Sequence, residues 1–300
     1  MKSNFRWIFI PICIIYLCLP LVASTGTYSM NFVELINTVK AEALSNSVTA
    51  LTQKDAMFVN PASISLNKDF IISAQLFSYV EDIQYKQFFL LKSFNFGNVA
   101  LSYTFLDYGK YAISTTVDKQ GESSGTIENK SASIQLNYAK RVQKFNFGVA
   151  AKYIQDTLYI YDADQLSFDV GLQYSVYSGL TIGASSTNIS ITKASYLNDS
   201  AHMRRTDRFG LMYSPLFFGR KWTCYLDLIW LNEDTLNFSV GSSLLLHEKL
   251  SIYFGKESVS DIHDFSMGVS INSNLFELDF SYKPNNVFND TYRVGVTLGL

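Results

Sequence analysis

Long segments of alternating apolar and polar residues are the feature of this sequence that most restricts its fold. A side-chain period of two is that of a β-strand whose two faces meet different surroundings. Such segments follow one another from Phe70 to the C-terminus. Each is about 9 to 12 residues long, the length that a tilted strand needs to cross a bilayer. The clearest cover residues 99–105, 132–138, 147–153, 166–174, 250–254, 265–271, 276–282 and 292–300.

Two kinds of β-fold show this alternation, the soluble sandwich and the transmembrane barrel. Strands of a sandwich average about 5 or 6 residues, shorter than the segments seen here. Tyrosines such as Tyr138, Tyr174 and Tyr282 lie near segment ends, where an amphipathic ring meets a membrane surface. We therefore predict an all-β fold, a transmembrane antiparallel up-and-down barrel of about 14 strands over residues 69–300. An exported soluble β-sandwich with a role in adhesion is the alternative.

The connections between the segments alternate in length. Short links are expected at 92–98, 141–145, 176–179, 214–221, 246–249 and 272–274, and longer ones at 107–125, 155–164, 187–206 and 283–290. Outer-membrane barrels have short periplasmic turns and longer outer loops. With an even number of strands, both ends of the barrel are expected on the periplasmic side.

The N-terminus has the layout of a secretory signal peptide. Lys2 and Arg6 precede an apolar stretch over 7–21, and small residues follow over 22–26. The apolar stretch is shorter than the ~20 residues of a spanning helix. We predict that residues 1–24 are cleaved on export to the outer membrane of a Gram-negative-type cell. Cys224 is then the only cysteine left, which excludes an intramolecular disulfide.

Composition and motifs argue against several functions. The formal net charge is −2 and the pI is about 5.9, so the chain lacks the basic surplus of a nucleic-acid-binding protein. The three histidines stand apart from one another, and no motif of a hydrolase, metalloenzyme or nucleotide-binding protein is present. We expect no cofactor, no metal site, no nucleic-acid partner and no enzymatic activity.

The period of the pattern changes between the signal peptide and the first strand. Phe32, Leu35 and Ile36 recur at three- and four-residue spacing, which predicts one or two short helices. Ser45 or Asn46 is a plausible N-cap for one of them. We assign residues 25–68 to a plug inside the barrel, called the hatch.

Glycines recur between apolar neighbours in the strand segments. Glycine weakens a strand unless the backbone must bend or another group approaches closely. Close approach of the hatch and the general abundance of glycine in barrels both explain this pattern, with about equal weight. The positions are Gly148, Gly171, Gly183, Gly210, Gly241, Gly268 and Gly295.

A family resemblance rests on the stretch over residues 41–66. It contains Asp55 and the triplet Asn60-Pro61-Ala62, and Ser45 and Asn46 stand where the family has a glycine pair. The stretch resembles the N-terminal signature of the PorV/PorQ proteins, which belong to the FadL-like superfamily of long-chain fatty-acid transporters. Further matches follow in order over 101–111, 148–154, 168–189 and 290–300.

The resemblance implies a barrel of 14 strands with a hatch in its lumen. It also implies one of two functions: transport of hydrophobic molecules such as fatty acids across the outer membrane, or service as a scaffold for the type IX secretion system. The expected partners are outer-membrane lipid and either a hydrophobic ligand or secretion-system proteins, with the barrel itself a monomer. Candidate site residues of the hatch motif are Asp55, Asn60, Pro61 and Ala62.

One basic cluster stands out beside the longest predicted loop. Arg204, Arg205 and Arg208 lie close to the expected outer end of a strand. Arginine binds phosphate bidentately, so these residues are candidates for contact with anionic lipid headgroups. A solvated loop base is the alternative interpretation.

Overall fold

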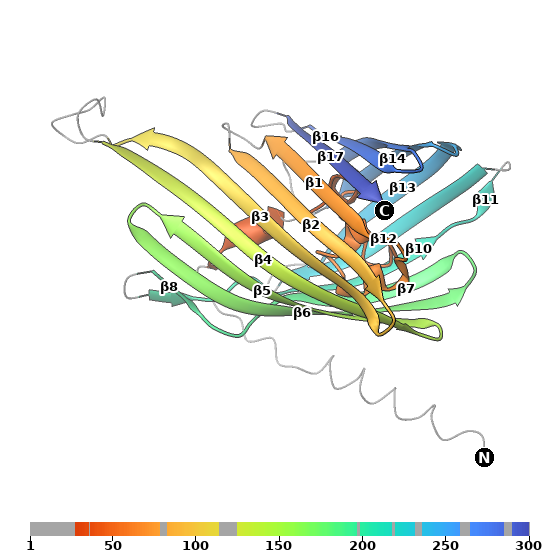
Figure 1. The fold of residues 1–300 in the computed structure, drawn as a ribbon, viewed down its shortest axis with the longest axis horizontal. Helices are drawn as coiled ribbons and strands as arrows, with labels where there is room; N and C mark the ends of the chain where they lie inside the picture. Colours follow the sequence, from red (N-terminus) through yellow and green to blue (C-terminus); the bar gives the residue numbers. More distant parts are fainter. Residues whose placement is uncertain are drawn as a thin grey trace, which may run out of the picture.

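The computed structural model describes residues 28–35, 37–78, 83–113, 125–196, 199–217, 220–231, 236–258, 265–284 and 290–299. The predicted signal peptide, residues 1–24, lies outside the described residues. Within them the chain forms a closed antiparallel barrel that surrounds its own N-terminal segment (Figure 1).

Fourteen long strands of the described residues make the wall. They are β1 (Ile71–Ser78), β2 (Gln84–Phe94), β3 (Gly97–Ala112), β4 (Thr126–Val142), β5 (Phe145–Leu158), β6 (Tyr161–Tyr177), β7 (Leu180–Ser190), β10 (Thr206–Tyr213), β12 (Arg220–Leu231), β13 (Leu236–His247), β14 (Leu250–Glu257), β15 (Phe265–Asn272), β16 (Phe276–Lys283) and β17 (Thr291–Gly299). Each wall strand pairs with its two neighbours in chain order, as an up-and-down barrel requires. Three minor strands are β8 (Ala194–Tyr196) with β9 (Asp199–Ala201) in a separate hairpin, and β11 (Leu216–Phe217) beside β12.

The first and last strands close the ring. β1 pairs with β17 from Ile71↔Gly299 to Ser78↔Tyr292. Because β1 begins and β17 ends at the same rim, both ends of the barrel lie there. Most short connections lie at this rim too, among them the two-residue turns 95–96, 143–144, 178–179 and 248–249. We call it the turn rim and the opposite one the loop rim.

The predicted long connection over residues 155–164 is wrong. β5 continues to Leu158 and β6 begins at Tyr161, so only a two-residue turn joins them. Asp156 lies within β5 and faces the lumen, where its carboxylate accepts a hydrogen bond from Ser131. The predicted loop over 187–206 contains the β8–β9 hairpin.

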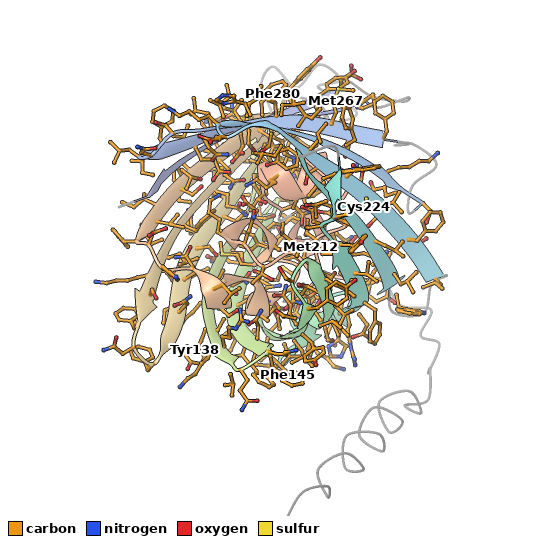
Figure 2. The ribbon with its side chains drawn as sticks, turned by 90° about the vertical axis from the view of Figure 1, so that its right-hand side faces the viewer. Tyr138, Phe145, Met212, Cys224, Met267 and Phe280 are labelled. Atoms are coloured by element: carbon orange, nitrogen blue, oxygen red, sulfur yellow. The ribbon has the colours of Figure 1, made fainter. Side chains whose placement is uncertain are left out.

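The wall has an apolar outer surface and a polar inner one. On β4, Ile134 and Leu136 are about half exposed on the outside, while Gln135 and Asn137 between them are buried in the lumen. Most inward positions of the other strands are polar too, apart from residues such as Phe89, Leu106 and Ile154. Aromatic rings such as Phe145 and Phe280 lie on the outer surface (Figure 2). This distribution is the reverse of that in a soluble protein and is the one that a transmembrane barrel needs.

A charged side chain in the middle of the outer band therefore tests its environment. We expect Leu136→Arg to destabilise the barrel in lipid by about 2 to 4 kcal/mol, the cost of placing arginine near the bilayer midplane. Thr126→Arg, on the same strand at the loop rim, is the matched control and should fold like the wild type. Urea titrations of both variants in liposomes measure the difference, and equal midpoints would contradict a lipid-facing position for Leu136.

The N-terminal segment runs through the lumen as short helical pieces. They are η1 (Asn31–Leu35), α2 (Val39–Ala43), η2 (Lys54–Ala56) and η3 (Pro61–Leu66). Seen along the barrel, these pieces are enclosed by the strands (Figure 2). No helix in the described part of the chain is long and apolar enough to cross a membrane.

Candidate functional site: the hatch and the cavities beside it

The helix α2 is capped at both ends by its own sequence. The Thr38 hydroxyl accepts a hydrogen bond from the amide of Ala41, and it donates one to the carbonyl oxygen of Asp55. Ser45 and Asn46 follow the helix with φ values of 47° and 58°. The expectation of an N-cap at Ser45 or Asn46 was wrong, because these residues take the left-handed conformation that ends a helix.

The triplet Asn60-Pro61-Ala62 fixes the second half of the hatch. The Asn60 carboxamide oxygen accepts from the Ala62 amide at 3.0 Å, which caps η3, and Pro61 occupies the first turn. The Asn60 amide group donates to the carbonyl oxygen of Thr49 at 2.8 Å. It also reaches the carbonyl oxygen of Leu172 in β6 at 3.3 Å. One side chain therefore joins two parts of the hatch to the wall.

Asp55 belongs to a buried cluster of four charges. Its carboxylate lies 3.1 Å from the ammonium groups of both Lys40 and Lys54. Glu277 of β16 lies 2.6 Å from Lys40 and 2.5 Å from Lys54, so it completes the cluster from the wall. Burial alone would lower the pKa of Lys40, but Asp55 and Glu277 raise this pKa well above its ordinary value. Each lysine thus has two carboxylate partners inside the barrel. We call this the inner cluster.

A second cluster lies on the other side of α2. Glu42 is 3.1 Å from the guanidinium of Arg293 in β17 and 3.8 Å from the ammonium of Lys283 in β16. Lys283 also pairs with Glu257 of β14. The Arg293 guanidinium stacks over the ring of Phe77 at 3.8 Å and donates to the carbonyl oxygen of Asn37. We call this the outer cluster, because its wall residues lie towards the loop rim.

The loop after α2 is tied to the wall by a carboxylate. Asp227 of β12 accepts hydrogen bonds from the amide and the hydroxyl of Thr49, at 3.0 and 2.6 Å. Arg208 of β10 lies 4.0 Å from Asp227 and donates to the carbonyl oxygen of Asn46 at 3.1 Å. These contacts add to the charged groups that join the hatch to the barrel.

Glycines face the hatch on eight strands of the wall. A methyl group at Gly148 would lie 2.2 Å from backbone atoms of Pro61 and Ala62, and one at Gly171 would lie 1.9 Å from the Asn60 side chain. Of the two explanations offered for the repeated glycines, the close approach of the hatch is confirmed. We call these residues the glycine belt; Gly255 joins the seven identified from the sequence, and the full set is Gly148, Gly171, Gly183, Gly210, Gly241, Gly255, Gly268 and Gly295.

Two cavities lie beside the hatch among the residues that the structure describes. The outer cavity, of about 250 Å³, lies towards the loop rim between the hatch and the wall. The inner cavity, of about 830 Å³, opens at the turn rim. Each is lined by both apolar and charged residues. The apolar side of the outer cavity consists of Val33, Leu35, Phe58, Val59, Ile229 and Leu231.

The three arginines of the basic cluster have different surroundings. Arg208 lines the outer cavity, so it lies inside the barrel and away from lipid headgroups. Arg205 pairs with Asp207, and Arg204 lies over the ring of Tyr28 and 3.5 Å from Glu34. Contact with anionic lipid stays a prediction for Arg204 and Arg205.

The charged wall residues of the two clusters were missed in the sequence. Each one occupies an inward position of a strand, so its sequence neighbours face outward. A charge at an inward position of an alternating segment is the signal that would have found Glu277, Lys283 and Arg293. Their partners in the hatch could not be identified, since Lys40 and Glu277 are separated by 237 residues. The described residues hold no group of three His, Cys, Asp or Glu side chains placed to bind a metal.

Similarity to known proteins is found in structure and not in sequence. No family model matches the chain, and no curated protein matches it. The toluene transporter TodX of Pseudomonas putida aligns with a TM-score of 0.56 at 10% identity, over 87% of this chain and 96% of that one. The CymD monoaromatic hydrocarbon channel aligns with a TM-score of 0.57 at 8% identity, over 91% of this chain and 99% of that one. The closed barrel of 14 strands formed by the described residues is thus a fold that this chain shares with TodX and CymD.

Proposed function

We propose that this protein carries hydrophobic small molecules across the outer membrane. The observation that carries the proposal is the division of a closed barrel by its own N-terminal segment, with a partly apolar cavity on each side of it. Such a plug would obstruct an open aqueous pore. TodX and CymD, described as a toluene transporter and a monoaromatic hydrocarbon channel, have the same fold, which supports transport over enzymatic activity.

The proposal includes the location and the division of the chain. An apolar outer surface on a closed barrel supports insertion in an outer membrane, and the N-terminal sequence supports export with cleavage of residues 1–24. Residues 25–68 would then be the hatch and 69–300 a monomeric barrel. Membership of the PorV/PorQ group within the FadL-like superfamily is supported by the retained Asp55 and Asn60-Pro61-Ala62.

The hatch motif has a structural role in this proposal. Asn60, Pro61 and Ala62 hold η3 against β5 and β6, and Asp55 balances the two lysines of the inner cluster. These residues keep the plug in place and need not contact the transported molecule.

Uptake by intact cells tests the function. Gram-negative host cells without a hydrocarbon transporter of their own would express the full chain and receive radiolabelled oleate or toluene. We expect uptake of at least one of the two to exceed that of cells with an empty vector. Uptake equal to the empty vector for both would contradict the proposal, and co-purification of a secreted protein with the barrel would instead favour the scaffold function.

A further inference from the structure

Four cationic residues lie together at the turn rim, on the ends of neighbouring strands. They are Lys92 of β2, Lys140 and Arg141 of β4, and Lys144 in the turn that follows β4. The two segments that carry them, residues 92–98 and 138–147, contain no Asp or Glu. This part of the rim is therefore positive throughout. We call the four residues the basic corner.

Two lysines of the basic corner lie where the apolar outer band ends. On β4 the outward positions run from Ile134 through Leu136 to Tyr138, and the next one is the exposed Lys140. Lys92, also exposed, pairs with Val99, which pairs with Tyr138 on its other side. Both lysines thus lie at the edge of the band, where a long side chain places its ammonium group among the lipid headgroups.

Three aromatic rings adjoin these lysines on the outer surface. The rings of Phe94 and Phe96 are stacked with their centroids 5.0 Å apart, and the ring of Tyr138 follows at 6.4 Å from that of Phe96. The ammonium group of Lys92 lies 5.4 Å from the centroid of the Phe94 ring. We call Phe94, Phe96 and Tyr138 the aromatic platform.

The aromatic platform is fixed to the turn between β2 and β3. The Tyr138 hydroxyl donates a hydrogen bond to the carbonyl oxygen of Phe96 at 2.8 Å. A methyl group at Gly97 would lie 2.7 Å from the Tyr138 ring, so this ring lies directly against the backbone of the turn. A surface whose rings are already held in place loses little conformational entropy when a ligand binds to it.

The loop-rim ends of nearby strands have a different charge. Lys110 and Lys130 both pair with Glu128, so their charges are partly balanced within the protein. Asp162 and Asp164 of β6 add negative charge at the same rim. An anionic headgroup is therefore attracted to the basic corner and not to this part of the loop rim.

The basic corner and the aromatic platform fit the headgroup region of an anionic phospholipid. Ammonium and guanidinium groups form charge-assisted hydrogen bonds with phosphate oxygens. Aromatic rings at a membrane interface pack against the glycerol backbone and the upper part of the acyl chains. A zwitterionic headgroup carries a cation of its own, which the basic corner would repel. The combination thus favours a lipid with a net negative charge.

We infer that the basic corner and the aromatic platform together form a binding site for an anionic phospholipid, in the leaflet that the turn rim faces. The phosphate lies with Lys92 and Lys140, and the upper acyl chains lie on the aromatic platform. Arg141 and Lys144 donate to the carbonyl oxygens of Gln143 and Val176, and they add to the attraction through their charge. The inference does not depend on what the barrel transports.

Native mass spectrometry of the full chain tests this site. The detergent-solubilised barrel is mixed with equal amounts of phosphatidylglycerol and phosphatidylethanolamine that have the same acyl chains. We expect the wild type to retain about tenfold more phosphatidylglycerol. In Lys92→Gln with Lys140→Gln this ratio should fall to about one, because the site has lost two of its charges. Lys92→Arg with Lys140→Arg should keep the preference, since guanidinium also pairs with phosphate.

Lys110→Gln with Lys130→Gln is the matched control, with the same change of charge at the loop rim. It should keep the full preference for phosphatidylglycerol. Loss of the preference in this control as well would show that net charge alone selects the lipid, and would overturn the site. Equal retention of both lipids by the wild type, or an unchanged preference in the glutamine variant of the basic corner, would overturn it too.

A third variant separates the aromatic platform from the charges. Phe94→Ala with Phe96→Ala removes two rings and leaves every cation in place. We expect the retained phosphatidylglycerol to fall severalfold, while the preference over phosphatidylethanolamine remains. Unchanged retention would contradict a site that includes the aromatic platform. Heat-modifiable migration in a gel shows for each variant that the barrel is closed.

Discussion

A single methyl group at position 148 is expected to dislodge the hatch. In Gly148→Ala the added carbon would lie 2.2 Å from the backbone of Pro61 and Ala62, and a backbone contact cannot be relieved by a change of rotamer. Overpacking of this kind costs about 1 to 3 kcal/mol, and more where the neighbour cannot move. We expect a lower urea midpoint for barrel unfolding in detergent, faster proteolysis within residues 54–66, and a higher conductance.

Gly299→Ala is the matched control. A methyl group at Gly299 meets nothing within 4 Å, although this glycine too lies in a wall strand. Replacement of glycine by alanine at an unstrained position stabilises a protein by about 0.4 to 1 kcal/mol through the unfolded state. The two substitutions are thus expected to change the free energy of unfolding in opposite directions. Equal midpoints for both would show that η3 does not lie against β5.

Removal of Glu277, the wall carboxylate of the inner cluster, is expected to destabilise the contact between α2 and the wall. Glu277→Ala leaves the ammonium groups of Lys40 and Lys54, each less than a tenth exposed, to share the single carboxylate of Asp55. An uncompensated buried charge costs about 3 to 5 kcal/mol. Because the cost falls on the contact between α2 and the wall, we expect release of α2, seen as increased hydrogen exchange over residues 39–46.

Glu128→Ala controls for the loss of a glutamate that bridges two lysines. Glu128 pairs with Lys110 and Lys130 in an exposed group at the loop rim, where water replaces the lost partner. We expect no measurable change in hydrogen exchange over residues 39–46 for this variant.

A second-site change tests the charge balance itself. In Glu277→Ala with Lys54→Met, one lysine again faces one carboxylate. Much of the protection from hydrogen exchange over residues 39–46 should therefore return. No recovery in the double variant would mean that Glu277 acts through packing rather than through charge.

The barrel could be predicted because the alternation of apolar and polar residues is a local pattern that recurs in every strand. Each strand carries its own period of two, so an error in one segment leaves the others intact. The connection over 155–164 was predicted too long, since polar residues such as Asp156 continue the strand with their side chains in the lumen. In a barrel with an apolar exterior and a polar interior, an aspartate therefore does not by itself indicate a turn.

The site was predictable only in part. Asp55 and Asn60-Pro61-Ala62 were identified through resemblance, and Asn60 takes its partners from β6 and from the loop after α2. The ion pairs that hold α2 join residues far apart in the sequence, such as Glu42 with Arg293. No local pattern encodes such a pair. The inward position of each wall charge is encoded, but the choice of partner depends on how the hatch folds.

The glycine belt has a consequence for the order in which the molecule is built. The hatch precedes the barrel in the chain, and it lies so close to glycines of strands from β5 to β17 that a methyl group at most of them would clash with it. We therefore expect the N-terminal segment to be in place as a template while the strands assemble around it. The last step is then the pairing of β17 with β1, which seals the template inside. A barrel without its N-terminal segment would enclose water, and the backbone at the glycine belt would be exposed to that water.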